Sequence, residues 1–177
     1  TPYFYKKDDL EILEAMASQL GLKLSEVKLI EGLVEARRRM DSDLRMGRDV
    51  QSLIIPSSIP PWNSIRFASY YEPMTEVSGD YFDVIRKGSS LTAMIADVSG
   101  HGVPAALITM SIHHAFNRCV EGGYGLVEML DEINEALRPR LPDGSYITAQ
   151  IIRIYSDQTY AVVNAGHIRA YHYRQFS

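Results

Sequence analysis

Two short stretches decide the fold of this chain: Gly-Asp-Tyr-Phe-Asp-Val at residues 79–84 and Asp-Val-Ser-Gly-His-Gly at residues 97–102. The apolar run between them, residues 91–96, predicts a buried strand because apolar side chains occupy both parities. Each stretch places a carboxylate at the edge of a strand, where burial is costly unless a cation pairs with it. Mg2+ and Mn2+ prefer oxygen ligands. The two stretches therefore predict half of a divalent-metal site.

The two aspartates of the first stretch are separated by strand alternation. In an extended backbone Asp80 shares one face with Phe82 and Val84, whereas Asp83 shares the other face with Tyr81. We therefore assign Asp80, and not Asp83, to the metal. Two interpretations of Asp83 stay open: a surface or turn-stabilising carboxylate, or a group that hydrogen-bonds to a metal ligand from behind.

The loop after the second strand has a glycine on either side of a histidine. Gly100 and Gly102 permit a tight turn and leave backbone groups open to an ion or a phosphate. A site for a hard cation does not need imidazole, so His101 is expected to shape the loop or to support a ligand. His167, which follows another glycine, is interpreted in the same way, and Gly79 belongs to the same supporting set.

Composition excludes several classes of protein. The 177 residues, 46% of them hydrophobic, suffice for one modest domain with an appendage. A net charge of -4 does not indicate a nucleic-acid-binding protein, because such proteins are typically basic. No apolar run approaches the roughly 20 residues of a membrane span, and no signal-peptide pattern follows Thr1. A cytoplasmic location is expected, with an upstream sensory or membrane-anchored region left open.

Residues 8–55 predict one long helix after a short tail at residues 1–7 that ends an upstream region. The apolar stripe of its first half has 3-4 spacing and consists of Leu10, Leu13, Ala17, Leu20, Leu24 and Val27. A change of phase near residues 28–33 predicts a coiled coil with a skip. A helix of about 70 Å cannot bury this stripe on so small a domain, so a homodimer is expected. Two shorter helices, broken near Gly32 or Gly47, are the alternative.

Residues 56–177 predict a second domain, and a cluster of prolines at its start marks the boundary. Aromatic alternation predicts a strand at residues 65–71, and turn residues at 87–90 predict a hairpin between the two motif strands. Two amphipathic helices and three strands are expected to follow, at residues 104–119, 126–137, 146–155, 159–164 and 168–173. Strands, then paired helices, then strands favour an α+β layered domain.

Three blocks of sequence together resemble the PPM-type metal-dependent serine/threonine phosphatases, and more narrowly their bacterial SpoIIE/RsbU-like branch. They are Glu-Val-Ser-Gly-Asp-Tyr-Phe-Asp at 76–83, Asp-Val-Ser-Gly-His-Gly-Val-Pro-Ala-Ala-Leu at 97–107 and Asn-Ala-Gly-His at 164–167. Residues 48–56 also match that branch's entry into the catalytic domain, and the resemblance covers about residues 44–173. It implies an α-β-β-α sandwich that is incomplete in this chain.

The resemblance implies roles for three positions. Asp80 would ligate a metal ion, Asp97 would bridge two ions of Mn2+ or Mg2+, and the backbone carbonyl of Val98 would add a ligand. The two ions would activate a water for in-line attack on phosphoserine or phosphothreonine, with no phosphoenzyme. Ser78 and Phe82 stand where Gly and Tyr are usual, and neither carries a ligand.

One departure from the family pattern is larger. The family's remaining metal-binding aspartates lie beyond the Asn-Ala-Gly-His block, the first of them in a Ser-Asp-Gly motif. This chain ends at Ser177 and contains no such motif. We expect a portion cut from a longer protein, and the alternative is a natural fragment with reduced or no activity.

The function that the resemblance implies is that of a metal-dependent phosphatase in bacterial partner-switching signalling. Its substrate would be a phosphorylated anti-sigma-factor antagonist, and the N-terminal helix would gate it. The alternative is a catalytically incomplete, dimerising regulatory module. Residues 4–20 also resemble the last helix of a GAF sensor domain running into a signalling helix.

Overall fold

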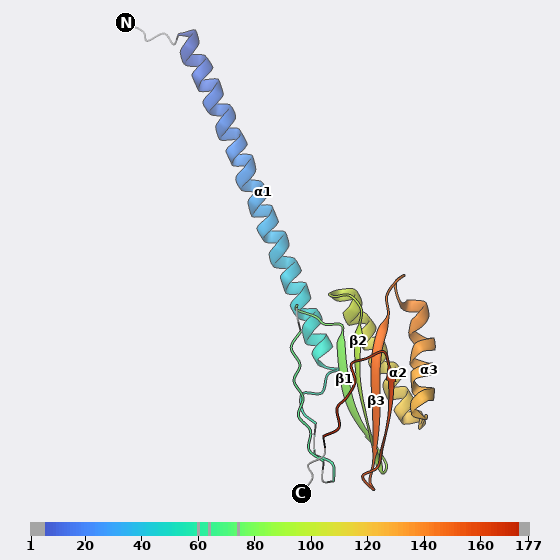
Figure 1. Cartoon of the computed structure of the whole chain (residues 1–177). Helices are drawn as coiled ribbons and strands as arrows, with labels where there is room; N and C mark the ends of the chain where they lie inside the picture. Colours follow the sequence, from blue (N-terminus) through green and yellow to red (C-terminus); the bar gives the residue numbers. More distant parts are fainter. Residues whose placement is uncertain (1–5, 60, 64, 74, 174–177) are drawn as a thin grey trace. The chain divides into compact units, whose positions relative to one another are not determined.

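The computed structural model describes residues 6–59, 61–63, 65–73 and 75–173 (Figure 1). The chain divides into two units, Thr1–Asp43 and Leu44–Ser177. Helix α1 runs from Lys7 to Ser52 and so extends from the first unit into the second. The other elements, all in the second unit, are β1 (Asp80–Lys87), β2 (Ser90–Val98), α2 (Val103–Gly122), α3 (Leu126–Leu137), the 3-10 helix η1 (Arg138–Arg140), β3 (Ile147–Tyr155) and β4 (Tyr160–Ala165).

Helix α1 is continuous through Gly32 and Gly47, so the alternative of two shorter helices broken at these glycines is wrong. Asp8 and Asp9 lie in its first turn, where the positive end of the helix dipole favours carboxylates. Its large apolar side chains are exposed in the single chain, Leu20 at 62%. The long helix is confirmed, while its pairing as a coiled coil stays a prediction. Among the described residues no helix is long and apolar enough to span a membrane.

The last turns of α1 pack within the second unit. The buried Gln51 donates from Nε2 to the carbonyl of Ser78 at 2.7 Å and to Thr109 Oγ1 at 2.9 Å. Its Oε1 accepts from the Ser78 N–H at 3.0 Å. Arg48 forms a 2.9 Å ion pair with Glu76. These contacts hold the end of α1 beside the segment that leads into β1. The predicted domain boundary at residues 55/56 stays a prediction.

The sheet is antiparallel with the strand order β1-β2-β3-β4. Its register pairs Asp80 with Asp97 across β1 and β2, and Asp97 with Thr148 across β2 and β3. Gly88 has a φ of 57°, in the left-handed region that the tight turn between β1 and β2 needs. The predicted hairpin is therefore formed, and its two aspartates lie opposite each other at one end.

Helices α2 and α3 cover one face of this sheet (Figure 1). The core lies between the helices and the sheet. It includes the buried Tyr81, Met94 and Ile151 from the strands and Ile112 and Phe116 from α2. Since side chains alternate along a strand, the residues next to these core positions face away from the helices. The aspartates at the end of the hairpin lie on that second face.

Two segments that were predicted as strands are not strands. Residues 65–71 and 168–173 form no ladder, apart from an isolated bridge between Trp62 and Ile65. Aromatic and β-branched residues suit a strand, but a strand forms only where a partner offers backbone groups. Among the described residues neither segment has such a partner: the sheet ends at β1 on one side and at β4 on the other, and neither edge strand forms a ladder with these segments.

Candidate metal centre

Three strands bring polar side chains into one row on the face away from the helices. Asp80, Asp97 and Thr148 occupy paired positions on β1, β2 and β3. Partial burial raises the pKa of Asp97, and the nearby Asp80 charge raises it further, whereas His167 lowers it. A cation between the two carboxylates would offset both the burial and the repulsion. The row is therefore electrostatically suited to bind a positive ion.

The Asn-Ala-Gly-His block forms a closed turn beside this row. His167 Nδ1 lies 2.8 Å from Thr148 Oγ1, and the His167 N–H donates to Asn164 Oδ1 at 2.9 Å. Asn164 Nδ2 donates in return to the His167 carbonyl at 3.1 Å. Gly166 has a φ of 71°, which favours glycine. The sequence indicates a turn at His167, but it gives no sign of Thr148, because only strand register places that residue opposite Asp97.

The two glycines of the loop between β2 and α2 adopt the tight-turn conformations that the sequence predicts. Gly100 and Gly102 have φ values of 99° and 76°, a region that disfavours side chains. His101 between them is exposed. A Cβ added to Gly79 would lie 2.8 Å from the carbonyl oxygen of Val98. Only glycine therefore lets the start of β1 approach that carbonyl so closely.

The donor set fits one side of a centre for a divalent cation. Asp80 and Asp97 pair across the hairpin, and Val98 follows Asp97 directly. Two carboxylates and a carbonyl oxygen are hard ligands of the kind that Mg2+ and Mn2+ take. In the part of the chain that the structure describes, no group of three or more His, Cys, Asp or Glu side chains could hold a metal ion. The residues match part of a metal site rather than a complete one.

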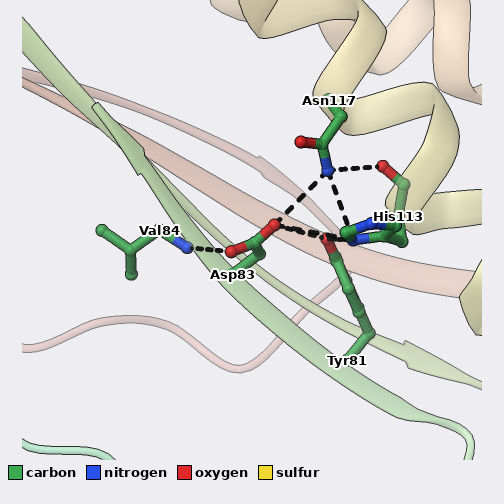
Figure 2. A network of polar contacts seen from close by, with 5 residues as sticks. All are labelled: Tyr81, Asp83, Val84, His113 and Asn117. Atoms are coloured by element: carbon green, nitrogen blue, oxygen red, sulfur yellow. Dashed lines mark hydrogen bonds and ion pairs between the residues drawn. The ribbon is translucent and has the colours of Figure 1, made fainter. Parts of the chain in front are cut away.

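Asp83 faces the helices and lies away from the metal row. It is only 9% exposed, so its interpretation as a surface carboxylate is wrong. Figure 2 shows its polar contacts. Tyr81 Oη donates to Asp83 Oδ2 at 3.1 Å and lies 3.1 Å from His113 Nδ1, while the Val84 N–H donates to Asp83 Oδ1 at 2.7 Å. Burial raises the pKa of the Tyr81 phenol, and the Asp83 charge raises it further, so the phenol keeps its proton.

Asn117 completes this network from the next turn of α2. Its Nδ2 donates to the His113 carbonyl at 2.9 Å and lies 3.2 Å from His113 Nδ1 and 3.5 Å from Asp83 Oδ2. The network ties β1 to α2 through the core side of the sheet (Figure 2). This role of His113 and Asn117 is not evident from the sequence. Their i, i+4 spacing places them on one helix face, but not against a particular strand.

Comparison with known proteins agrees with these observations. The family model for Stage II sporulation protein E (SpoIIE) matches residues 87–176, just over half of the chain. Phosphoserine phosphatase RsbU of Bacillus subtilis (strain 168) is 25% identical over 169 residues, which cover 94% of this chain and 49% of the relative. Phosphoserine phosphatase RsbP of the same strain is 31% identical over 133 residues, covering 71% and 32%. The chain thus spans half or less of the length of these curated relatives.

A solved structure shares the fold. The SiaA-PP2C domain of Pseudomonas aeruginosa superimposes with a TM-score of 0.58 at 20% sequence identity, over 73% of this chain and 54% of that one. At this level of identity the likeness concerns the fold alone. It confirms the predicted α+β class, with a sheet and helices arranged as in a PP2C domain.

Proposed function

The chain belongs to the SpoIIE family, and we propose that it forms the metal-binding side of a protein serine/threonine phosphatase. The observation that carries the proposal is the pairing of Asp80 with Asp97 across a hairpin, beside the close approach of Gly79 to the Val98 carbonyl. The names of the two Bacillus relatives as phosphoserine phosphatases support it. Because the chain covers only part of each relative, the activity belongs to the complete protein.

Family membership implies dependence on metal ions, and we propose Mn2+ or Mg2+, with two ions in the complete site. Bound ions of this type supply a nucleophilic water and stabilise charge at the phosphoryl group. Within this chain, Asp80 and Asp97 would hold the ions through carboxylate oxygens and Val98 through its carbonyl. Among the described residues, nothing beyond the chain neighbours lies within 4 Å of a Cβ added to Gly100 or Gly102, so the loop backbone there is open to an ion or a phosphate.

The substrate that we propose is a phosphoserine or phosphothreonine protein of the anti-sigma-factor antagonist type, acted on in the cytoplasm. The exposed apolar stripe of α1 supports a homodimer, since apolar surface of this extent favours a protein partner. The predicted GAF-type sensor domain upstream of α1 stays a prediction.

Phosphate release tests the proposed activity. The complete protein is expected to release phosphate from a phosphorylated antagonist with Mn2+ or Mg2+, and to lose this activity in EDTA and in the Asp97→Asn variant. The matched control is Asp131→Asn, the same change at an exposed position on α3, which should keep full activity. Full activity of Asp97→Asn, or of the wild type in EDTA, would overturn the proposal.

A second candidate function is a dimerising regulatory module with an incomplete site. It is favoured by one observation: among the described residues, no third side chain joins the two aspartates as a metal ligand. Titration of this chain with Mn2+ by calorimetry separates the two functions. Binding that is lost in Asp97→Asn supports the phosphatase half-site, whereas no binding by this chain or by the complete protein supports the module.

A further inference from the structure

The hydroxyl of Tyr71 is buried and has no hydrogen-bond partner among the residues that the structure describes. Most buried polar groups in proteins are hydrogen-bonded, and an unpaired one destabilises the folded chain. An exception of this kind is typical of a site that is completed by another group. The neighbours of Tyr71 indicate which group that is.

Tyr71 lies against the metal-facing side of β1. Its ring centroid is 6.1 Å from that of Phe82, with the planes tilted by 54°, and Phe82 shares its strand face with Asp80. Burial raises the pKa of the Tyr71 phenol, a side-chain interaction with Ser78 lowers it, and the Asp80 charge raises it to a smaller extent. Ser78 and Asp80 both lie near enough to influence the phenol, and the contact with Ser78 falls outside strict hydrogen-bond geometry.

Among the described residues, the side-chain hydrogen bonding of the Asp80 carboxylate is weak. Ser78 Oγ accepts from the Asp80 N–H at 3.0 Å, but its own contact with Asp80 Oδ2 is long, at 3.4 Å. Carboxylates that ligate metals are normally oriented by hydrogen bonds from groups behind them. A phenol is a suitable donor for this task, and Tyr71 places one beside Asp80 with its hydrogen-bonding capacity unused.

We propose that Tyr71 is a positioning residue of the candidate metal centre, whose hydroxyl donates to the Asp80 carboxylate when that carboxylate holds a cation. This inference rests on the proposed function, because it needs Asp80 as a metal ligand. The hydroxyl then contributes to metal affinity and not to the stability of the metal-free chain. A purely structural hydroxyl would have the opposite effects.

The Tyr71→Phe variant tests this role because it removes only the hydroxyl. Mn2+ affinity, measured by calorimetry and by water-proton relaxation, is expected to fall about 10–100-fold. The melting temperature in EDTA is expected to stay unchanged or to rise, because an unpaired buried group is lost. The matched control is Tyr70→Phe, the same change at a neighbour that is 85% exposed, which should leave both quantities unchanged.

The outcomes separate this inference from the function on which it rests. Wild-type Mn2+ binding that is lost in Asp97→Asn but unchanged in Tyr71→Phe would overturn the role of Tyr71 alone. A lower melting temperature of Tyr71→Phe in EDTA would also overturn it, because the hydroxyl would then stabilise the metal-free fold. Absence of Mn2+ binding by both this chain and the complete protein would overturn the half-site and the positioning role together.

Discussion

Asp97 lies where its negative charge disfavours the folded state when no cation is bound. Partial burial and the Asp80 charge raise its pKa above the ordinary value of 3.8. A carboxyl whose pKa is raised on folding binds its proton more tightly in the folded chain than in the unfolded chain. Stability therefore falls as the pH rises through the folded pKa, and the ionised group opposes folding at neutral pH.

Asp97→Asn is accordingly expected to raise the melting temperature of the metal-free chain at pH 7. The gain should shrink as the pH falls toward 3.8, because the wild-type carboxyl is then protonated as well. Thermal unfolding in EDTA over this pH range measures the effect. A lower melting temperature of the variant at pH 7 would contradict the expectation.

Asp157→Asn serves as a control, because it should change the melting temperature in the opposite direction to Asp97→Asn. Hydrogen bonds from the hydroxyl and backbone N–H of Thr159 lower the pKa of Asp157. The ionised Asp157 therefore stabilises the folded chain above the ordinary carboxyl pKa, and this contribution is lost as the pH falls through the folded value. The variant should melt slightly below the wild type at pH 7, with the difference vanishing in acid.

Asp83 has a structural role that its sequence context does not reveal. Asp83→Ala would leave Tyr81 Oη and the Val84 N–H without their carboxylate acceptor. The free energy of unfolding should fall by about 1–3 kcal/mol, the usual cost of an unsatisfied buried polar group. Urea unfolding followed by the fluorescence of Trp62, which is buried and is the single tryptophan, measures it.

The control for Asp83 is Asp131→Ala on α3, at an exposed position. Its effect should stay within about 0.5 kcal/mol, as for most surface substitutions. Equal effects of the two substitutions would show that the network around Asp83 contributes nothing specific to stability.

At the scale of elements, the hairpin and α2 depend on one close approach. Gly79, just before β1, brings the chain against the end of β2 and the first turn of α2. An added Cβ would lie 2.8 Å from the Val98 carbonyl oxygen and 3.2 Å from the Ala105 Cβ. Both neighbours are buried and belong to regular elements, so neither moves without cost.

Gly79→Ala should therefore lower the free energy of unfolding of the second unit by about 1–3 kcal/mol, the usual cost of overpacking. Trp62 fluorescence in urea reports this transition. Gly32→Ala is the matched control, because nothing lies within 4 Å of its added Cβ. Within α1 it should stabilise the helix by about 0.5–1 kcal/mol. No loss of stability in Gly79→Ala would mean that the approach is not needed.

At the scale of the whole molecule, α1 presents apolar side chains that the first unit leaves uncovered. Leu20 and Leu24 are 62% and 56% exposed. The salt bridges on this helix, such as Lys23–Glu26, are highly exposed and contribute little to stability. A helix of this length gains most of its stability by packing its apolar stripe, and a second copy of the chain is the proposed partner.

Sedimentation equilibrium is expected to show that the wild-type chain is a dimer. The double variant Leu20→Asp/Leu24→Asp should raise the Kd of this dimer at least about 100-fold, because each buried Leu contributes about 1.5–3 kcal/mol. Ser18→Asp is the control, since residue 18 lies on the opposite side of the helix from the stripe. A wild-type chain that remains a monomer at high concentration would contradict the dimer.

The helices and the hairpin were predictable from sequence because their signals are local. The spacing of apolar residues in α2 and α3, and the turn residues Lys87–Ser90, specify these elements without distant partners. The opposite orientations of Asp80 and Asp83 also follow from alternation alone. The resemblance to the phosphatase family rested on residues 76–83, 97–107 and 164–167, whose order and spacing are properties of the chain itself.

Only the tertiary structure decided what depends on contacts between distant segments. Strand register placed Thr148 beside Asp97, and helix packing buried Asp83 against α2. Residues 65–71 have the composition of a strand, but strand formation requires backbone partners that composition does not supply. The unpaired hydroxyl of Tyr71 likewise appears only when the chain is folded. Local preferences follow from the order of residues, whereas pairing and burial follow from which segments meet.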